Sequence, residues 1–244
     1  MASPPARLSN ITTPNLPCIT LHSPENQISK PTAQTPPRRS ANLHQALLTK
    51  LRPLPFQYIY AFYHQKSSTL SGPKSLTLLS DSIPDIATFY RIYNNFPFGS
   101  VTLKDSVHVF RSGVQPLWED AENLAGGCWV LKVRREDDRS LKVFEEIAIM
   151  VVGGELQVAV QGERDHVLGV SYSPRLYWAH ISVWTKKGGN KKSVEALEST
   201  ILERLSEDLR PKSASEYYYK KHSDHEGWEE ATRDVKEGLE KSSQ

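Results

Sequence analysis

The sequence is poor in cysteine, in net charge and in long apolar runs, and each shortage excludes a class of protein. Only two cysteines, Cys18 and Cys128, occur in 244 residues, which excludes a disulfide scaffold and favours reduced thiols. The formal net charge of +2 provides no broad field for nucleic acid, so any such contact must be local. No apolar run approaches the length of a membrane span or a signal core. We therefore expect a cytoplasmic protein without a membrane segment, with the nucleus as the alternative compartment.

The N-terminal part of the chain lacks aromatic residues and glycine altogether before Phe56, and its first 42 residues hold half of the 16 prolines. Without aromatic side chains this stretch cannot bury enough surface to offset its chain entropy. We therefore predict a disordered Pro/Ser/Thr-rich tail over 1–50, a folded domain over 51–225, and a charged tail over 226–244 that frays.

The folded part alternates between segments typical of strands and of helices. Aromatic and β-branched residues predict strands over 56–63 and 177–185, and we interpret 155–160 and 167–172 as a strand pair. Apolar residues at helical spacing predict three helices: one capped by Ser82, one over 141–152, and one capped by Ser193. These elements predict an α+β domain whose single antiparallel sheet is covered by helices on one face. The other face stays free to bind a ligand.

The motifs of the common enzyme classes are missing from the sequence. It contains no GxSxG element, no phosphate-binding loop followed by Lys-Ser/Thr, no HExxH and no CxxC. His64, His108, His166 and His180 have no partner at the spacing of metal ligands, and His222 and His225 lie in a part of the chain that we expect to fray. We therefore predict a binding protein without catalysis, cofactor or metal.

The densest candidate site is the stretch 110–133, in which Trp118 and Glu119 lie in a loop between two predicted strands. An indole face stacks on a flat ring, and a neighbouring carboxylate accepts hydrogen bonds from two adjacent N–H groups such as those of guanine. Each such charge-assisted bond contributes roughly 1.5–3 kcal/mol. Taken alone, the dipeptide is more often a packed indole beside a solvated acid, so the flanking residues decide the interpretation.

These flanking residues resemble the translation initiation factor 4E family, which binds the 7-methylguanosine cap of messenger RNA. The run GVQPLWEDAENLAGGCW follows the family pattern G-(I/V)-x-P-x-W-E-D-x-x-N-x-x-G-G-x-W without a gap, and GVSYSPRLYWAHISVWT resembles the hairpin that comes later. The resemblance covers about residues 50 to 225. It implies a curved antiparallel sheet with three helices on its convex face and the cap in its concave face.

The resemblance also implies a role for each matching residue around the guanine. Trp118 stacks on the methylated base, Glu119 accepts from its two N–H donors, and Trp184 contacts the methyl group. The methylated base is cationic, so stacking on the indole gains a cation–π contribution. Trp129 corresponds to a structural tryptophan of the core.

For the cap phosphates, the resemblance implies that Arg175 binds them through its guanidinium. His180 replaces a phosphate-binding lysine of the family, and histidine is mostly neutral near pH 7. Phosphate attraction should therefore be weaker and depend on pH. Lys186 and Lys187, in the loop KKGGNKK, are the cations that we expect to compensate.

The main departure from the family is the second aromatic plate, which normally comes from the loop after the first strand. Here that loop reads HQKSSTLSGPK and contains no aromatic residue. Losing one stacked face should cost roughly 1–3 kcal/mol of binding free energy. The candidate substitutes are Tyr177, Trp178 and Trp228, which the sequence alone does not rank. Tyr60 and Tyr63 stand at first-strand positions that are tryptophan in the standard factor, and such aromatic replacements resemble the divergent 4E-homologous-protein group. Together with the missing plate, they predict weakened cap affinity.

Members of the family bind partners on the convex face through a helix of the Tyr-x4-Leu-apolar type, supplied by an initiation factor 4G-type scaffold or a 4E-binding protein. The matching positions here are Leu54, Pro55, Phe56, Ile86 and Tyr90, although Ile86 and Tyr90 at helical spacing are also typical of core residues. We therefore predict a monomer that binds capped mRNA in translation initiation or its regulation. The alternative is a protein–protein interaction module or translational repressor that keeps the fold, with weak or lost cap binding.

Overall fold

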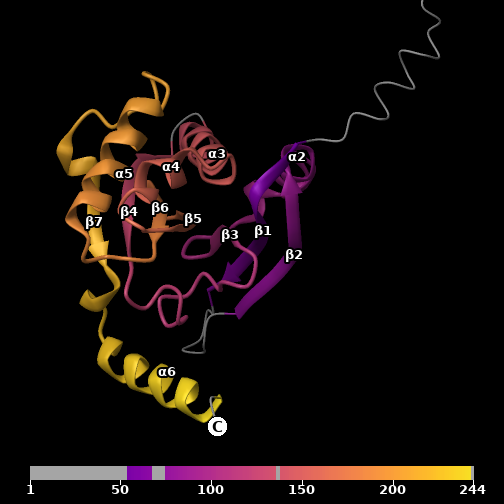
Figure 1. The fold of residues 1–244 in the computed structure, drawn as a ribbon. Helices are drawn as coiled ribbons and strands as arrows, with labels where there is room; N and C mark the ends of the chain where they lie inside the picture. Colours follow the sequence, from indigo (N-terminus) through magenta and orange to yellow (C-terminus); the bar gives the residue numbers. More distant parts are fainter. Residues whose placement is uncertain (1–53, 68–74, 136–137, 243–244) are drawn as a thin grey trace, which may run out of the picture. The chain divides into compact units, whose positions relative to one another are not determined.

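The computed structural model describes residues 54–67, 75–135 and 138–242, so the predicted tail over 1–50 lies outside the described part of the chain. A curved, open, antiparallel sheet of seven strands forms its centre, in the order β2-β1-β3-β5-β6-β4-β7 (Figure 1). The strands are β1 (Pro55–Lys66), β2 (Ser75–Asp85), β3 (Ser106–Arg111), β4 (Gly127–Arg134), β5 (Val167–Pro174), β6 (Trp178–Thr185) and β7 (Tyr217–Lys221).

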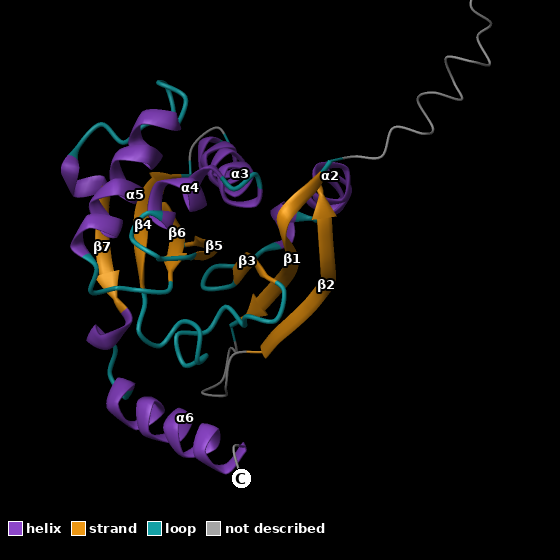
Figure 2. Cartoon of the chain, viewed as in Figure 1, coloured by secondary structure: helices purple, strands orange, loops and turns teal. Residues whose placement is uncertain are grey.

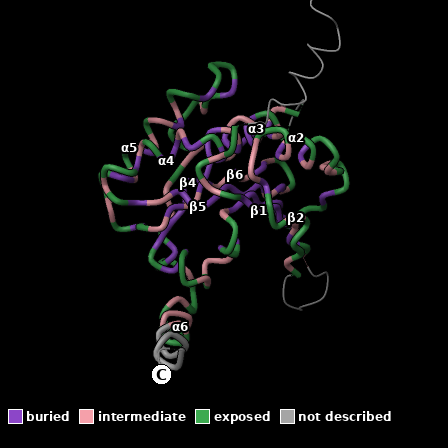
Figure 3. Tube along the Cα trace, turned by 45° about the vertical axis from the view of Figure 1, so that its right-hand side comes forward, coloured by how far each residue is buried: buried purple, intermediate pink, exposed green. Residues whose placement is uncertain are grey.

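Four helices supply buried side chains to the main core, on the side of the sheet that they share (Figure 2). They are α2 (Ile86–Asn95), α3 (Arg139–Val152), α4 (Glu155–Gln161) and α5 (Lys191–Arg204). A fifth helix, α6 (Trp228–Ser242), and the short turns η1 (Phe98–Ser100), η2 (Ala214–Glu216) and η3 (His222–Asp224) complete the described elements. Burial is concentrated along the central strands and the inner side of α3 (Figure 3). The predicted α+β class, with one antiparallel sheet, is therefore confirmed.

Strand β6 shows how the sheet separates a core face from a free face. Ala179, Ile181 and Val183 are fully buried and pack into the core beneath the helices. Because side chains alternate along a strand, the intervening residues point to the opposite face. These half-buried residues are Trp178, His180, Ser182 and Trp184. The candidate ligand residues of β6 therefore share the face that the helices leave free.

The segment after Gly154 is a helix, which corrects the strand predicted over 155–160. An alternating pattern would place Leu156, Val158 and Val160 on one face. In α4, Leu156 and Val160 are fully buried whereas Val158 is 61% exposed. A strand would bury Val158 together with Leu156 and Val160, whereas a helix buries residues four positions apart and turns the one between them outward. Tertiary packing thus overrode the local alternation.

The predicted N-caps are also wrong by three residues each. Ser82 lies inside β2, and Asp85 caps α2 by accepting a hydrogen bond of 2.8 Å from the backbone N–H of Thr88. At α5 the cap is Asn190, whose side chain accepts from the backbone N–H of Ser193 at 3.3 Å. Aspartate and asparagine are at least as effective as serine at this position, so either residue type satisfies the helix.

Candidate functional site

The loop between β3 and β4, residues 112–126, carries Trp118 and is called the Trp118 loop below. Two polar residues hold it from within. The Asp120 carboxylate accepts from the backbone N–H groups of Gln115 (3.1 Å) and Glu122 (2.9 Å). The side-chain amide of the fully buried Asn123 donates to the carbonyls of Gln115 and Leu117, both at 2.7 Å. A loop pinned in this way is preorganised for binding.

Trp118 and Glu119 come directly before Asp120 in the loop. Glu119 is exposed and Trp118 is half-buried, so neither side chain is part of the buried frame. The end of the loop is equally constrained, since a Cβ on Gly126 would collide with the carbonyl oxygen of Thr185 on β6. The backbone contact at this glycine fastens the Trp118 loop to the strand that carries Trp184.

Two histidines near the C-terminus lie against the two tryptophans of the site. The His225 ring is parallel to the Trp118 indole, with an interplanar angle of 1° and centroids 5.3 Å apart. The His222 ring lies 4.6 Å from that of Trp184, and the two histidine rings are 6.0 Å apart. The structure thus joins Trp118 and Trp184 through rings that the sequence analysis did not assign to the site.

His222 is almost completely buried and is kept neutral. Burial, followed by the nearby His225 and Lys220, lowers the pKa of His222 to about 4. Both of its ring nitrogens, and the indole N–H of Trp184, are buried without a hydrogen-bond partner among the described residues. Such atoms are rare in native structures and indicate a place where water or a ligand supplies the missing bonds.

A second group of ionisable residues occupies the other end of β6 and is called the ionisable cluster: Lys132, Arg175 and His180. Lys132 is the register partner of His180 across β4 and β6, and Arg175 lies in the turn between β5 and β6. Burial is the main cause that lowers the pKa of His180, and the charges of Arg175 and Lys132 add to it. Near pH 7 the cluster therefore presents two cations and a neutral imidazole.

The sequence alone does not reveal Lys132 as a candidate, because only the pairing of β4 with β6 brings it beside His180. Lys186 and Lys187, by contrast, follow the opposite end of β6, whose eight residues span roughly 23 Å. The ammonium of Lys186 lies 2.6 Å from the Glu122 carboxylate, and the backbone N–H of Lys187 donates to buried Asp165. Neither lysine belongs to the ionisable cluster.

Each of the three aromatic residues considered as a second plate has another position or role. Tyr177 is 72% exposed in the turn before β6. The Trp178 ring lies under the guanidinium of Arg134 at 4.9 Å, six residues and roughly 20 Å along β6 from Trp184. Trp228 donates its indole N–H to the carbonyl of Leu124 at 2.8 Å, so it fastens the start of α6 to the Trp118 loop.

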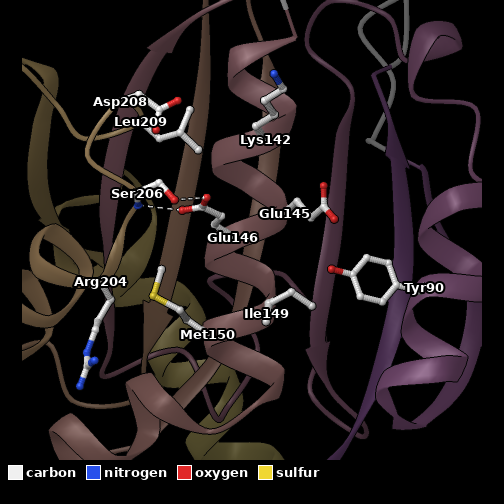
Figure 4. Close-up of a pocket in the computed structure, with 10 residues that line it drawn as sticks. All are labelled: Tyr90, Lys142, Glu145, Glu146, Ile149, Met150, Arg204, Ser206, Asp208 and Leu209. Carbon is white, nitrogen blue, oxygen red and sulfur yellow. Dashed lines mark hydrogen bonds between the residues drawn. The ribbon is translucent and has the colours of Figure 1, made fainter. Parts of the chain in front are cut away.

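On the helix side, a hollow of about 610 Å³ opens between α2, α3 and the segment after α5 (Figure 4). Its apolar lining comes from Tyr90, Ile149, Met150 and Leu209. Glu146 is held there by Ser206, which donates from its backbone N–H (2.9 Å) and its hydroxyl (2.6 Å). The hollow combines an aromatic edge with flanking carboxylates.

The predicted partner residues lie at or near the surface. Leu54 is 87% exposed, Ile86 is 38% exposed, and Tyr90 is half-buried. Pro55 is exposed and pairs with Asp85, directly before Ile86, and the half-buried Phe56 packs against the Tyr60 ring at 6.2 Å. Ile86 and Tyr90 are therefore not fully buried core residues.

The described residues contain no candidate for a membrane span or for a metal site. None of the helices there is both long and apolar enough to cross a membrane. In the same residues, no three side chains of His, Cys, Asp or Glu gather in a way that could hold a metal ion.

Known proteins resemble this chain in sequence. "Eukaryotic translation initiation factor NCBP" of Oryza sativa subsp. japonica is 30% identical over 99 residues, which cover 41% of this chain and 40% of the relative. "Eukaryotic translation initiation factor 4E" of Homo sapiens is 27% identical over 156 residues, covering 63% of this chain and 68% of the relative. The match thus spans about two fifths of the plant relative's length.

Solved structures resemble it in fold. The complex of C. elegans eIF4E-3 with the 4E-binding protein Mextli and cap analog has a TM-score of 0.61 at 20% identity, covering 71% of this chain and 95% of that chain. Ascaris suum eIF4E-3 with m7G cap has a TM-score of 0.60 at 19% identity, covering 71% and 94%. The family model described as "Eukaryotic initiation factor 4E" matches residues 55–236, well over half of the chain. The chain therefore belongs to the eukaryotic initiation factor 4E family.

Proposed function

We propose that this chain binds the 7-methylguanosine cap of messenger RNA and acts by binding alone, without catalysis, in translation initiation or its regulation. The observation that carries the proposal is the Trp118 loop, in which hydrogen bonds of Asp120 and Asn123 hold the segment that carries Trp118 and Glu119. Family membership and the cap-bound state of the Ascaris suum structure support it.

In this proposal the base lies on the indole of Trp118, and Glu119 accepts from two N–H groups on the guanine edge. A cationic methylated base gains a cation–π contribution over the indole that the unmethylated base lacks. Each bond to the carboxylate is charge-assisted and contributes roughly 1.5–3 kcal/mol. Trp184 is linked to the same site because its ring contacts His222, and the His222 ring contacts His225.

The phosphates would extend along the free sheet face to the ionisable cluster. Arg175 suits bidentate phosphate contacts, and Lys132 supplies a second point charge. The neutral His180 contributes little attraction near pH 7, because its pKa is lowered. We therefore propose Lys132 as a phosphate-binding residue in addition to Arg175, whereas Lys186, paired with Glu122, has no such role in the proposal.

The test is a titration of the purified protein with 7-methyl-GTP and with GTP, followed by tryptophan fluorescence. We expect 7-methyl-GTP to bind more tightly, and Trp118→Ala and Glu119→Gln each to weaken it at least roughly 10-fold. Glu207→Gln, an exposed position after α5, is the matched control and should leave the affinity unchanged. Binding that ignores both methylation and the two site substitutions would contradict the proposal.

We also propose that the surface around Tyr90 and Ile86 binds a helix of the Tyr-x4-Leu-apolar type from an initiation factor 4G-type scaffold or a 4E-binding protein. The hollow lined by Tyr90 and Ile149 supports this, because it offers apolar surface at the edge of a helix layer. The 4E-binding protein in the C. elegans complex supports the class of partner.

A peptide carrying that motif, titrated calorimetrically, tests the second proposal. Tyr90→Ala and Ile86→Asp should each weaken peptide binding about 10-fold or more while the affinity for 7-methyl-GTP stays the same. Leu103→Asp, on an exposed apolar residue before β3, is the control for adding a charge. Peptide affinities that remain equal in all variants would show that the partner surface lies elsewhere.

A further inference from the structure

The His225 ring, from the C-terminal segment, contacts Trp118, and the proposed cap site does not yet give it a role. His225 lies parallel to the indole at 5.3 Å, directly after η3. We propose that His225 is the second stacking plate of this chain, closing on the base from the side opposite Trp118. The inference rests on the proposed cap binding and names the residue that replaces the missing aromatic plate.

The spacing of the two rings sets what binding requires. Stacked bases follow one another at roughly 3.4 Å, so two plates around an intercalated base lie roughly 6.8 Å apart. Trp118 and His225 are 5.3 Å apart between centroids, so no base fits between them as they stand. Because the centroid distance is an upper bound on the gap between two parallel planes, the plates must separate by at least roughly 1.5 Å while remaining parallel, and the interplanar angle of 1° already provides the parallel geometry.

The chain around His225 can make such a movement. His225 lies in a short connection between η3 and α6, it is half-buried, and its backbone N–H donates to the carbonyl of His222 at 3.0 Å. Two residues later Gly227 has φ +82, with nothing within 4 Å of where its Cβ would be. A glycine in this region allows a change of chain direction without strain. Trp228 limits the movement, because its indole bond to Leu124 keeps the segment beside the Trp118 loop.

The polar atoms next to this pair of rings point to a ligand with a polar edge. The indole N–H of Trp184 and both ring nitrogens of His222 are buried without a partner among the described residues, and the two rings are in contact at 4.6 Å. An unsatisfied buried polar group carries its full desolvation cost, so three such atoms in one place are unfavourable. The His222 ring lies 6.0 Å from that of His225, so in this proposal rings that part to admit a purine also bring these atoms within reach of its ring nitrogens and exocyclic groups.

The remaining aromatic side chains near the free face do not compete for this role. Trp178 lies at the far end of β6, and Trp228 uses its ring to hold the loop. Phe110 is fully buried against Trp184, so it supports that indole from beneath. Among the described residues, His225 is the ring that faces the Trp118 indole in a parallel stack.

The decisive experiment measures the affinity of the full chain for 7-methyl-GTP and GTP in three variants. His225→Ala should weaken 7-methyl-GTP binding roughly 5- to 150-fold, the loss expected for one stacked face. His225→Phe keeps a flat ring and should bind within about threefold of the wild type. Glu226→Ala, the exposed neighbour, is the matched control and should be unchanged. Tighter or equal binding in His225→Ala would overturn the proposal, because a ring that merely covers Trp118 competes with the base.

A ligand-free readout checks the stack itself. The imidazole protons of His225 should show an upfield ring-current shift in the NMR spectrum that disappears in Trp118→Ala. If the chemical shifts of these protons are the same in Trp118→Ala, the proposal that His225 is a stacking plate is overturned. If the wild type binds 7-methyl-GTP and His225→Ala binds it equally, the plate alone is wrong and cap binding stands. If the wild type binds neither nucleotide, both proposals are overturned.

Discussion

The two ends of the free sheet face are built from different kinds of interaction. At one end, rings from two loops gather around Trp118 and Trp184, and hydrogen bonds within the Trp118 loop hold the shape. At the other end, the ionisable cluster is carried by β4, β6 and the turn before β6, and sheet register sets its spacing. The end with Trp118 and Trp184, called the base end, therefore depends on loop architecture. The end with the ionisable cluster, called the phosphate end, depends on charge placed along strands. A substitution at one end should leave the property of the other end unchanged.

The largest expected effect concerns the frame of the Trp118 loop. Asn123→Ala removes two buried hydrogen bonds and leaves a small cavity, while the carbonyls of Gln115 and Leu117 keep only their backbone donors, so the free energy of unfolding should fall by about 3 kcal/mol. Binding of 7-methyl-GTP should be lost with it. Urea denaturation measures the first effect, and Asn94→Ala, at an exposed position of α2, is the control. Full stability in Asn123→Ala would show that the loop does not depend on this amide.

Acidification should destabilise the base end next. The pKa of His222 is lowered from 6.5 to about 4 in the folded protein, so the unfolded chain takes up a proton at a higher pH than the folded chain does. The free energy of unfolding should therefore be highest above about pH 6.5 and fall by about 3 kcal/mol as the pH drops toward 4. His222→Phe retains a ring against Trp184 and should reduce this slope.

Urea denaturation at about pH 7.5 and about pH 5 provides the measurement. The pKa values of His166 and His180 are also lowered, so a smaller slope of the same sign should persist in His222→Phe. Identical slopes in the wild type and the variant would show that His222 is not the group that titrates.

A smaller effect is expected at the phosphate end. His180→Lys places a fixed charge beside Arg175 and Lys132, so 7-methyl-GTP should bind about 3- to 10-fold more tightly at low salt. The nucleoside 7-methylguanosine, which lacks phosphates, should bind the variant and the wild type equally. Lys132→Gln should lower the affinity for 7-methyl-GTP and leave the affinity for 7-methylguanosine unchanged. An equal change for both ligands would mean that the two ends are not independent.

The smallest expected effect concerns the accessibility of the Cys128 thiol, which reports how well the base end is closed to solvent. Burial raises the pKa of the Cys128 thiol to about 12, and this residue is the register partner of Trp184. In Cys18→Ser, which leaves Cys128 as the single thiol, alkylation by iodoacetamide at about pH 8 should be negligible until denaturant unfolds the chain. Rapid alkylation of the folded protein would show that the base end opens readily. Mass spectrometry measures the extent of reaction.

The sequence predicted best where a motif is contiguous. The spacing of tryptophan, glutamate, aspartate and asparagine in the Trp118 loop is local, and the structure shows its cause in the bonds of Asp120 and Asn123. The alternation along 177–185 likewise predicted a strand, and β6 confirms it. The segment 155–160 was misassigned because both patterns were compatible with its apolar residues, and only burial against the core decided between them.

By itself, then, the sequence determined the α+β class, the family resemblance and the candidate residues that lie within continuous motifs. Tertiary structure alone decided that Lys132 joins Arg175 and His180, that Lys186 pairs with Glu122, and that two C-terminal histidines lie against two tryptophans. The physical reason is the separation along the sequence over which each interaction acts. Hydrogen bonds and side-chain periodicity within a loop or strand act over a few residues, whereas sheet register and the path after β7 bring together segments far apart in the chain.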